Sequence, residues 1–75
     1  MGNLKRIRMA KGLSQSQLAK LSGVNLRMIQ KYELYTEKIN TAYVMTVYKL
    51  AKALDCEIID LLELDKEEWK NSSFF

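Results

Sequence analysis

The side chains best suited to chemistry in this sequence are Arg27, Gln30 and Lys31, which share the outward face of one predicted helix, opposite Ile29 and Tyr32. A guanidinium makes two parallel hydrogen bonds to guanine O6 and N7, and a glutamine amide pairs with adenine N6 and N7. A lysine reaches a guanine or a phosphate. The chemistry that these residues offer is recognition of a nucleic acid by hydrogen bonds and charge.

Catalysis and metal binding find little support in the composition. The chain has no histidine, which is the commonest general base, and its single cysteine, Cys56, has no partner for a thiol–imidazole pair or an internal disulfide. One thiol without imidazoles cannot assemble a zinc site. We therefore expect a protein that is not an enzyme and needs no metal or cofactor.

Charge is unevenly divided along the 75 residues. Residues 1–32 hold seven lysines and arginines and no acid, whereas residues 33–75 hold five basic and nine acidic side chains. The net charge of +3 hides this asymmetry. A segregated basic half is the electrostatic footprint expected of a protein that binds a polyanion, although a solvated charged surface would give the same count.

Five helices must position these residues, and the scarcity of glycine with the absence of proline favours an all-α fold. The first three are predicted over 3–11, 15–22 and 26–34. A loop over 35–41 leads to a fourth helix capped by Asn40 or Thr41, and a turn at Asp55 and Cys56 leads to the fifth. The apolar periodicity predicts a core from these helices, namely Leu4, Ile7, Leu18, Ala19, Leu21, Val24, Ile29, Tyr32, Tyr43, Val47, Leu50, Ala51, Leu54, Ile58, Leu61 and Leu62.

The connection between the second and third helices has a distinctive pattern. Ser14 and Gln17 match a capping box at the start of the second helix. Ala19 is small where two crossing helices approach, Gly23 supplies a positive φ for the turn, and Asn25 caps the third helix. Two short helices joined in this way form a helix-turn-helix.

With these residues in place, the chain resembles the Cro and phage-repressor class of helix-turn-helix proteins, also called XRE-like. The resemblance rests on Leu4, Arg8, residues 12–15, 18–19 and 23–24, Ile29, residues 32–33 and 50–51, and Leu54. It implies a compact five-helix repressor-like domain whose third helix lies in the major groove of DNA while the second crosses the phosphate backbone.

The resemblance also implies roles for single residues. Gln15 would touch a phosphate and brace the first recognition residue, and Arg8 and Glu33 would form a partly buried ion pair that fixes the recognition helix. Two places depart from the family pattern: Leu34-Tyr35 stands where a glycine is usual, and Asp55 and Glu57 replace the usual glycine and hydroxyl residue between helices four and five. The residues expected to contact DNA are Gln15, Asn25, Leu26, Arg27, Gln30, Lys31 and Lys38.

The sequence therefore predicts a helix-turn-helix domain over 1–64 and a polar tail over 65–75, in which one further helical turn could carry Trp69. Trp69, Phe74 and Phe75 pack either on their own domain or on a partner. No apolar run is long enough to span a bilayer and no signal peptide is legible, so a cytoplasmic protein is expected.

The predicted function is sequence-specific binding of double-stranded DNA by a homodimer, as a bacterial or phage transcriptional regulator, with repression favoured over activation. An alternative is a protein-interaction module, such as an antitoxin-like partner with the same fold. A non-specific accessory DNA-binding protein is the third reading.

Overall fold

The computed structural model describes residues 2–34 and 38–63, which form helices and contain no strand. The elements in chain order are α1 (Asn3–Ala10), α2 (Gln15–Ser22), α3 (Leu26–Glu33), the 3-10 helix η1 (Ile39–Thr41), α4 (Val44–Ala53) and α5 (Ile58–Leu61). The predicted all-α class and its five α-helices are confirmed.

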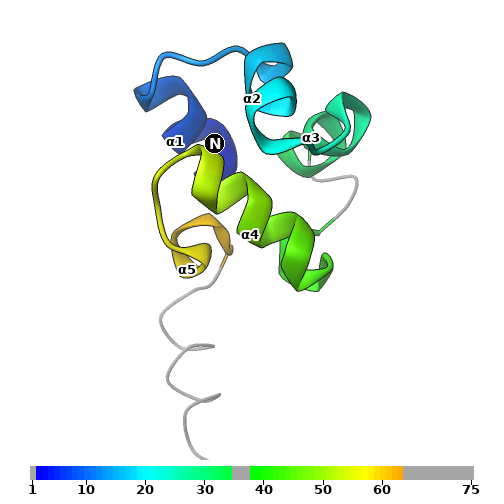
Figure 1. Ribbon diagram of the computed structural model, residues 1–75. Helices are drawn as coiled ribbons and strands as arrows, with labels where there is room; N and C mark the ends of the chain where they lie inside the picture. The colour runs from blue at the N-terminus through cyan, green and yellow to red at the C-terminus, as the bar shows by residue number, and fades with distance from the viewer. Residues whose placement is uncertain (1, 35–37, 64–75) are drawn as a thin grey trace, which may run out of the picture.

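The helices enclose a single core, and α2 takes part in two of the interfaces between helices. This helix packs against both α3 and α4, while α1 packs against α3 and α5, and α4 against α5. Figure 1 shows α2 and α3 next to one another at the top of the molecule, with α4 crossing beneath them and α5 below α4. The pair α2–α3 is thus supported by α1 and α4, and these two helices pack in turn against α5.

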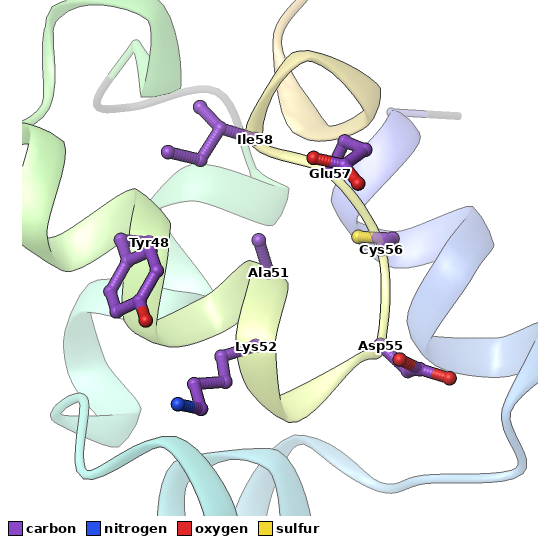
Figure 2. Close-up of a pocket in the computed structure, with 7 residues that line it drawn as sticks. All are labelled: Tyr48, Ala51, Lys52, Asp55, Cys56, Glu57 and Ile58. Atoms are coloured by element: carbon purple, nitrogen blue, oxygen red, sulfur yellow. The ribbon is translucent and has the colours of Figure 1, made fainter.

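Two helices end in the same hydrogen-bonded turn. After α1, Gly12 adopts φ +72°, and the Leu13 N–H donates to the Arg8 carbonyl. After α4, Asp55 adopts φ +54°, and the Cys56 N–H donates to the carbonyl five residues back. Figure 2 shows Asp55 and Cys56 where the chain leaves α4. Both are Schellman turns, and aspartate fills a left-handed position that usually takes glycine.

The start of α2 and the turn after it follow the predicted pattern. Ser14 Oγ accepts from the Gln17 N–H at 3.0 Å, and Gln17 Oε1 accepts from the Ser14 N–H at 2.7 Å, which completes the capping box. Gly23 has φ +75°, and Asn25 Oδ1 accepts from the Arg27 N–H at 2.7 Å. Backbone donors at both helix starts are satisfied by local side chains, so short helices of eight residues can begin where they do.

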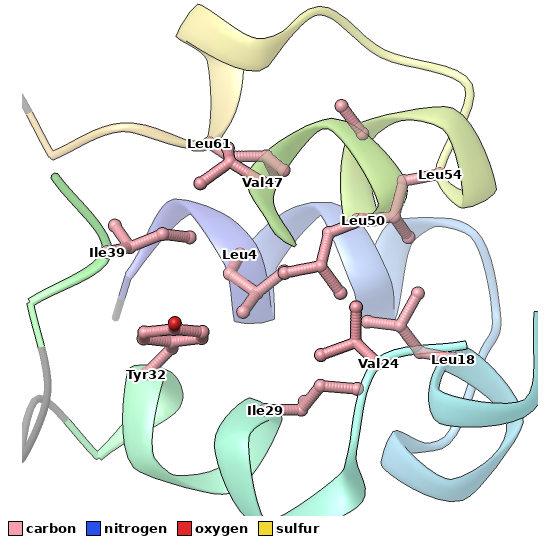
Figure 3. Close-up of a cluster of buried hydrophobic side chains, with 11 residues drawn as sticks. Leu4, Leu18, Val24, Ile29, Tyr32, Ile39, Val47, Leu50, Leu54 and Leu61 are labelled. Carbon is pink, nitrogen blue, oxygen red and sulfur yellow. The ribbon is translucent and has the colours of Figure 1, made fainter. Parts of the chain in front are cut away.

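Every helix contributes buried side chains to the core, and Val24 contributes from the turn between α2 and α3. Figure 3 shows Val24 between Leu18 and Ile29 in the wedge of the helix-turn-helix, with Leu50 above them. All four are buried. The full buried apolar set is Leu4, Leu18, Val24, Ile29, Tyr32, Ile39, Val47, Leu50, Ala51, Leu54 and Leu61.

The segment before α4 differs from its prediction. Residues 39–41 form η1 rather than a loop, and Ile39 is buried. Neither predicted residue caps α4, because the Thr41 hydroxyl donates to the Lys38 carbonyl and Asn40 bonds the backbone of Glu63. The helix begins after Tyr43 without a side-chain cap.

Two predicted core positions were wrong. Tyr43 is 86% exposed because its backbone is not yet helical, so the helical period does not extend to it. Leu21 is 62% exposed, since the inner face of α2 is centred on Leu18. Ile7, Ala19, Ile58 and Leu62 are half-buried and pack against the core as predicted.

The interpretations of Tyr35, and of Trp69, Phe74, Phe75 and a helical turn in the tail, lie outside the described residues. The same holds for the boundary drawn between residues 64 and 65.

Candidate nucleic-acid interface

Helix α3 has two faces of different character. Ile29, Tyr32 and Glu33 are buried on one side. Arg27 and Gln30 are exposed on the other. Because residues separated by three or four positions share a face, the exposed pair stands on the same side of the helix. The outward face of α3 therefore presents a guanidinium and an amide to whatever approaches it.

Leu26 in the first turn of α3 and Lys31 in its last turn lie next to these two positions, and Asn25 is the N-cap. Lys31 and Leu26 are half-buried, so each keeps part of its side chain accessible. Asn25 is exposed, and its Oδ1 is engaged in capping the helix. The five positions predicted on α3 and its N-cap therefore lie at one surface.

Gln15 and Lys38 belong to the elements that precede and follow α3 in the chain. Gln15 is the first residue of α2, is half-buried, and donates from Nε2 to Glu33 Oε1 at 3.0 Å. Lys38 is exposed beside η1, which follows α3 along the chain. The hydrogen bond from Gln15 gives the predicted sites on α2 and α3 a direct structural connection.

Glu33 and Arg8 form a buried ion pair on the side of α3 opposite its outward face. The Arg8 Nε donates to Glu33 Oε2 at 2.7 Å, and its Nη2 donates to Glu33 Oε1 at 3.0 Å. The side chain of Glu33 is only 3% exposed and that of Arg8 10%. The hydrogen bond to Glu33 raises the pKa of Arg8, against the opposite effect of burial.

The same guanidinium also holds the loop before α2. Its Nη1 donates to the Leu13 carbonyl at 2.7 Å, next to the Ser14 cap. Arg8 thus contacts the end of α3 and the start of α2 from its place on α1. Five donors in a rigid plane make arginine suited to such a junction.

The sequence pattern did not indicate two of these contacts. Nothing marks Gln15 as a partner of Glu33, since the two are far apart in the chain and glutamine at a helix start is common. The sequence also gives no sign that Arg8 donates to the Leu13 carbonyl, because a residue of any type can supply a backbone acceptor. The turn glycine at position 12 is the nearest signal, since it brings the loop back over α1.

A separate hollow of about 400 Å³ lies between α4 and the start of α5. Figure 2 shows Tyr48, Lys52 and Cys56 around it. The Lys52 Nζ lies 5.8 Å from the centroid of the Tyr48 ring. Burial raises the pKa of the Cys56 thiol, and the charge of Asp60 adds to the effect, so this sulfur is a neutral thiol near pH 7.

Comparison with known proteins decides the family. A family model described as helix-turn-helix matches residues 4–61, which span α1 to α5. The chain belongs to this helix-turn-helix family. The Cro and phage-repressor resemblance is therefore confirmed at the level of the family. No curated protein sequence and no solved structure matches the chain.

Membership supports a DNA-binding regulator as the general class of function. The family binds DNA and is not an enzyme family. Within residues 2–34 and 38–63, no group of three or more histidine, cysteine or acidic side chains is placed to hold a metal ion. In the same part of the chain, every helix is too short or too polar to cross a membrane.

Proposed function

We propose that this helix-turn-helix protein binds double-stranded DNA at specific sequences and regulates transcription, with α3 in the major groove. The observation that carries the proposal is the exposed face of α3, where Arg27 and Gln30 stand together on a helix whose other face is buried. Both side chains have donor patterns that match base edges, so they discriminate sequences rather than only charge.

The remaining polar groups support positioning on the phosphate backbone. Gln15 and Lys38 come from the elements on either side of α3, and the acid-free first 32 residues give this half of the protein a positive potential. Phosphate contacts set the register of a protein on the duplex while base contacts read the sequence. We assign Gln15 and Lys38 to the first role, Arg27 and Gln30 to the second, and Asn25, Leu26 and Lys31 to the surface between them.

We further propose a homodimer on the operator, acting in the cytoplasm as a bacterial or phage repressor. One domain of this size makes few base contacts, and helix-turn-helix proteins gain affinity by reading two half-sites about one helical turn apart. Repression follows because a dimer seated over a promoter excludes polymerase without any further surface, whereas activation requires one.

The experiment is selection of binding sites from a random DNA pool, followed by a salt titration on the selected site and on random duplex. A palindromic site is expected, bound at least about a thousandfold more tightly than random DNA. With about four phosphates neutralised per monomer, the slope of log K against log salt is expected on the order of −4, roughly doubled for a dimer. A steep slope without discrimination would instead identify a non-specific accessory protein.

The second candidate, an interaction module of the antitoxin-like kind, is favoured by one observation. Tyr43, Val44 and Met45 are all exposed at the start of α4, which is an unusual run of large apolar side chains in contact with water. No duplex binding at low salt, together with a stable complex formed through these residues, would decide for this candidate.

A further inference from the structure

The outward side of α4 carries large apolar side chains in contact with water. Val44, Met45 and Tyr48 are all exposed. Positions three or four residues apart share a face of a helix, so these three side chains form one stripe. Leu21, exposed in the last turn of α2, lines the same surface hollow as Tyr48 and extends the stripe to the neighbouring helix. We call Leu21, Val44, Met45 and Tyr48 the α2–α4 stripe.

The stripe has a positive border. Lys49 and Lys52 are exposed beside it, and α4 contains no acidic residue. The Lys52 ammonium lies over the Tyr48 ring, and Figure 2 shows both side chains on the same side of the helix. Leu21, Tyr48 and both lysines line a hollow of about 280 Å³. The surface therefore suits a large apolar side chain that has acidic residues next to it.

Residues 64–75, which follow Glu63, have this composition. Trp69 stands directly after two glutamates, and Phe74 and Phe75 come later in the same segment. Aromatic side chains of this size bury more area on packing than any others. Three acids and two lysines give the segment a net negative charge, opposite in sign to that of α4.

The structure fixes the point from which this segment starts. The Glu63 N–H donates to Asn40 Oδ1 at 2.7 Å, and Asn40 Nδ2 donates to the Glu63 carbonyl at 2.9 Å. In addition, Asn3 Nδ2 donates to the Leu62 carbonyl at 2.8 Å, and the Asn3 N–H donates to the Glu63 carboxylate at 2.6 Å. Residues 64–75 therefore begin next to Asn40, a few residues before the start of α4.

From this point Trp69 can reach the stripe within the same chain. The four residues from Asn40 to Val44 span at most about 14 Å, and the four helical residues from there to Tyr48 add about 6 Å. The six residues from Glu63 to Trp69 extend to about 20 Å before the length of the side chain is counted. The length of the segment therefore matches the distance that it has to cover.

Two other occupants fit the stripe less well. In a symmetric dimer that buried the stripe against itself, the positive border of one copy would face that of the other. A separate protein would have to compete with a segment of the same chain, whose effective concentration on so short a tether is in the millimolar range. The charge and the tether both favour residues 64–75.

We propose that residues 64–75 dock on the α2–α4 stripe of their own chain, with Trp69 against its apolar side chains and the preceding glutamates near Lys49 and Lys52. This interaction is independent of the DNA contacts proposed for α3. Val44 and Met45 also belong to the surface named for the antitoxin-like alternative. A partner protein that used that surface would first have to displace the docked segment.

The fluorescence of Trp69 tests the proposal in the full chain, because this is the only tryptophan in the sequence. Its emission maximum and its quenching by acrylamide are measured in buffer and in denaturant. Docking should shift the emission to shorter wavelength and should partly exclude the quencher. The chain in denaturant gives the reference for a free segment, from which the ratio of docked to free segment follows.

Val44→Ser/Met45→Ser removes two apolar contacts from the stripe. Both positions are exposed, so the fold should persist, and circular dichroism checks this. The ratio of docked to free segment should fall at least about tenfold, because two partly covered apolar side chains are lost. Met9→Ser/Ile59→Ser is the matched control, since both residues are 53% exposed and lie outside the stripe. It should leave the emission and the quenching unchanged.

A second pair of variants tests the charged border without changing the apolar side chains. Lys52→Glu repels the acids next to Trp69 and should lower the ratio of docked to free segment roughly twofold to fivefold at low salt. Added salt should reduce the difference from the parent. Lys5→Glu makes the same charge change at an exposed position of α1 and should have no effect.

Four results overturn the inference. A parent whose emission and quenching equal those of the chain in denaturant has no docked segment. Equal changes in the two double serine variants, or in the two charge variants, mean that Trp69 packs somewhere other than the stripe. Quenching that falls as the protein concentration rises assigns the stripe to residues 64–75 of a second copy, because docking within one chain does not depend on concentration.

Discussion

The α1–α3 region combines apolar burial with a buried polar junction, whereas the α4–α5 region has apolar burial at its centre. In the first, Glu33 joins three helices through hydrogen bonds of 2.7 to 3.0 Å. In the second, Leu50, Leu54 and Leu61 are completely buried and connect their helices by contact alone. The two regions share one core but use different forces to set the positions of their helices.

The difference reflects what each region must do. Hydrogen bonds depend on direction as well as distance, so a polar junction defines how α2 and α3 are oriented. Apolar packing tolerates small adjustments provided that volume is conserved. A recognition surface needs its groups within a fraction of an ångström of their targets, and the directional contacts lie directly behind that surface. The α4–α5 region adds its apolar burial to a core that all the helices share.

The largest expected effect comes from breaking the polar junction on one side. Glu33→Ala leaves the buried Arg8 without a counter-charge and Gln15 without its acceptor, and should lower the free energy of unfolding by about 3–5 kcal/mol. A thermal melt measures the loss, with Lys49→Ala as the control, because Lys49 is exposed on α4. A melting temperature within a degree or two of the parent would mean that the junction does not carry the fold.

A slightly smaller loss is expected from the apolar region. Leu50→Ala opens a cavity at a fully buried position and should cost about 3 kcal/mol of unfolding free energy. Urea denaturation measures it. The comparison is sharpened by DNA binding: corrected for the folded fraction, this variant should keep the parent affinity and specificity, since α4 carries none of the proposed contacts. A changed base preference would show that packing also sets the reading surface.

Arg27→Ala should affect DNA binding and leave stability unchanged, which is the opposite of the effect expected for Leu50→Ala. The side chain is exposed, so stability should hardly change, while affinity for the selected site should fall by about 1–3 kcal/mol and the preference at one base pair should relax. Competition between site variants measures the preference. Lys5→Ala serves as the control, with at most an equal loss on every duplex. Equal losses of Arg27→Ala on specific and random DNA would show that Arg27 does not read a base.

The smallest effect concerns the two matching turns, one in each region. Gly12 and Asp55 occupy the same left-handed position of a Schellman turn. Gly12→Ala should cost about 1 kcal/mol because an alanine resists positive φ, and Gly12→Asp should cost less, since aspartate tolerates that conformation. Chemical denaturation of the two variants provides the comparison. If Gly12→Ala and Gly12→Asp lower the free energy of unfolding equally, aspartate is present at position 55 because of contacts around α4 and not because of its backbone preference.

Local patterns predicted most of the fold. The Ser14 capping box, Gly23 and Asn25 marked both ends of the α2–α3 connection, because each satisfies a backbone group within a few residues of itself. The core was predicted well in the middle of helices. The prediction of the core failed at Leu21, whose burial depends on which neighbour covers it, and at Tyr43, whose burial depends on where the helix begins.

The sequence by itself determined the helix-turn-helix, its turns, the segregation of charge and the residue types on the outward face of α3, because all of these are properties of short stretches. Only the tertiary structure decided that Ile39 joins the core, that Asn40 holds the backbone of Glu63, and that Glu33 receives Gln15 as well as Arg8. The physical reason is the same in each case. These contacts join residues far apart in the chain, and whether such groups meet is fixed by how the helices pack and not by any pattern local to either partner.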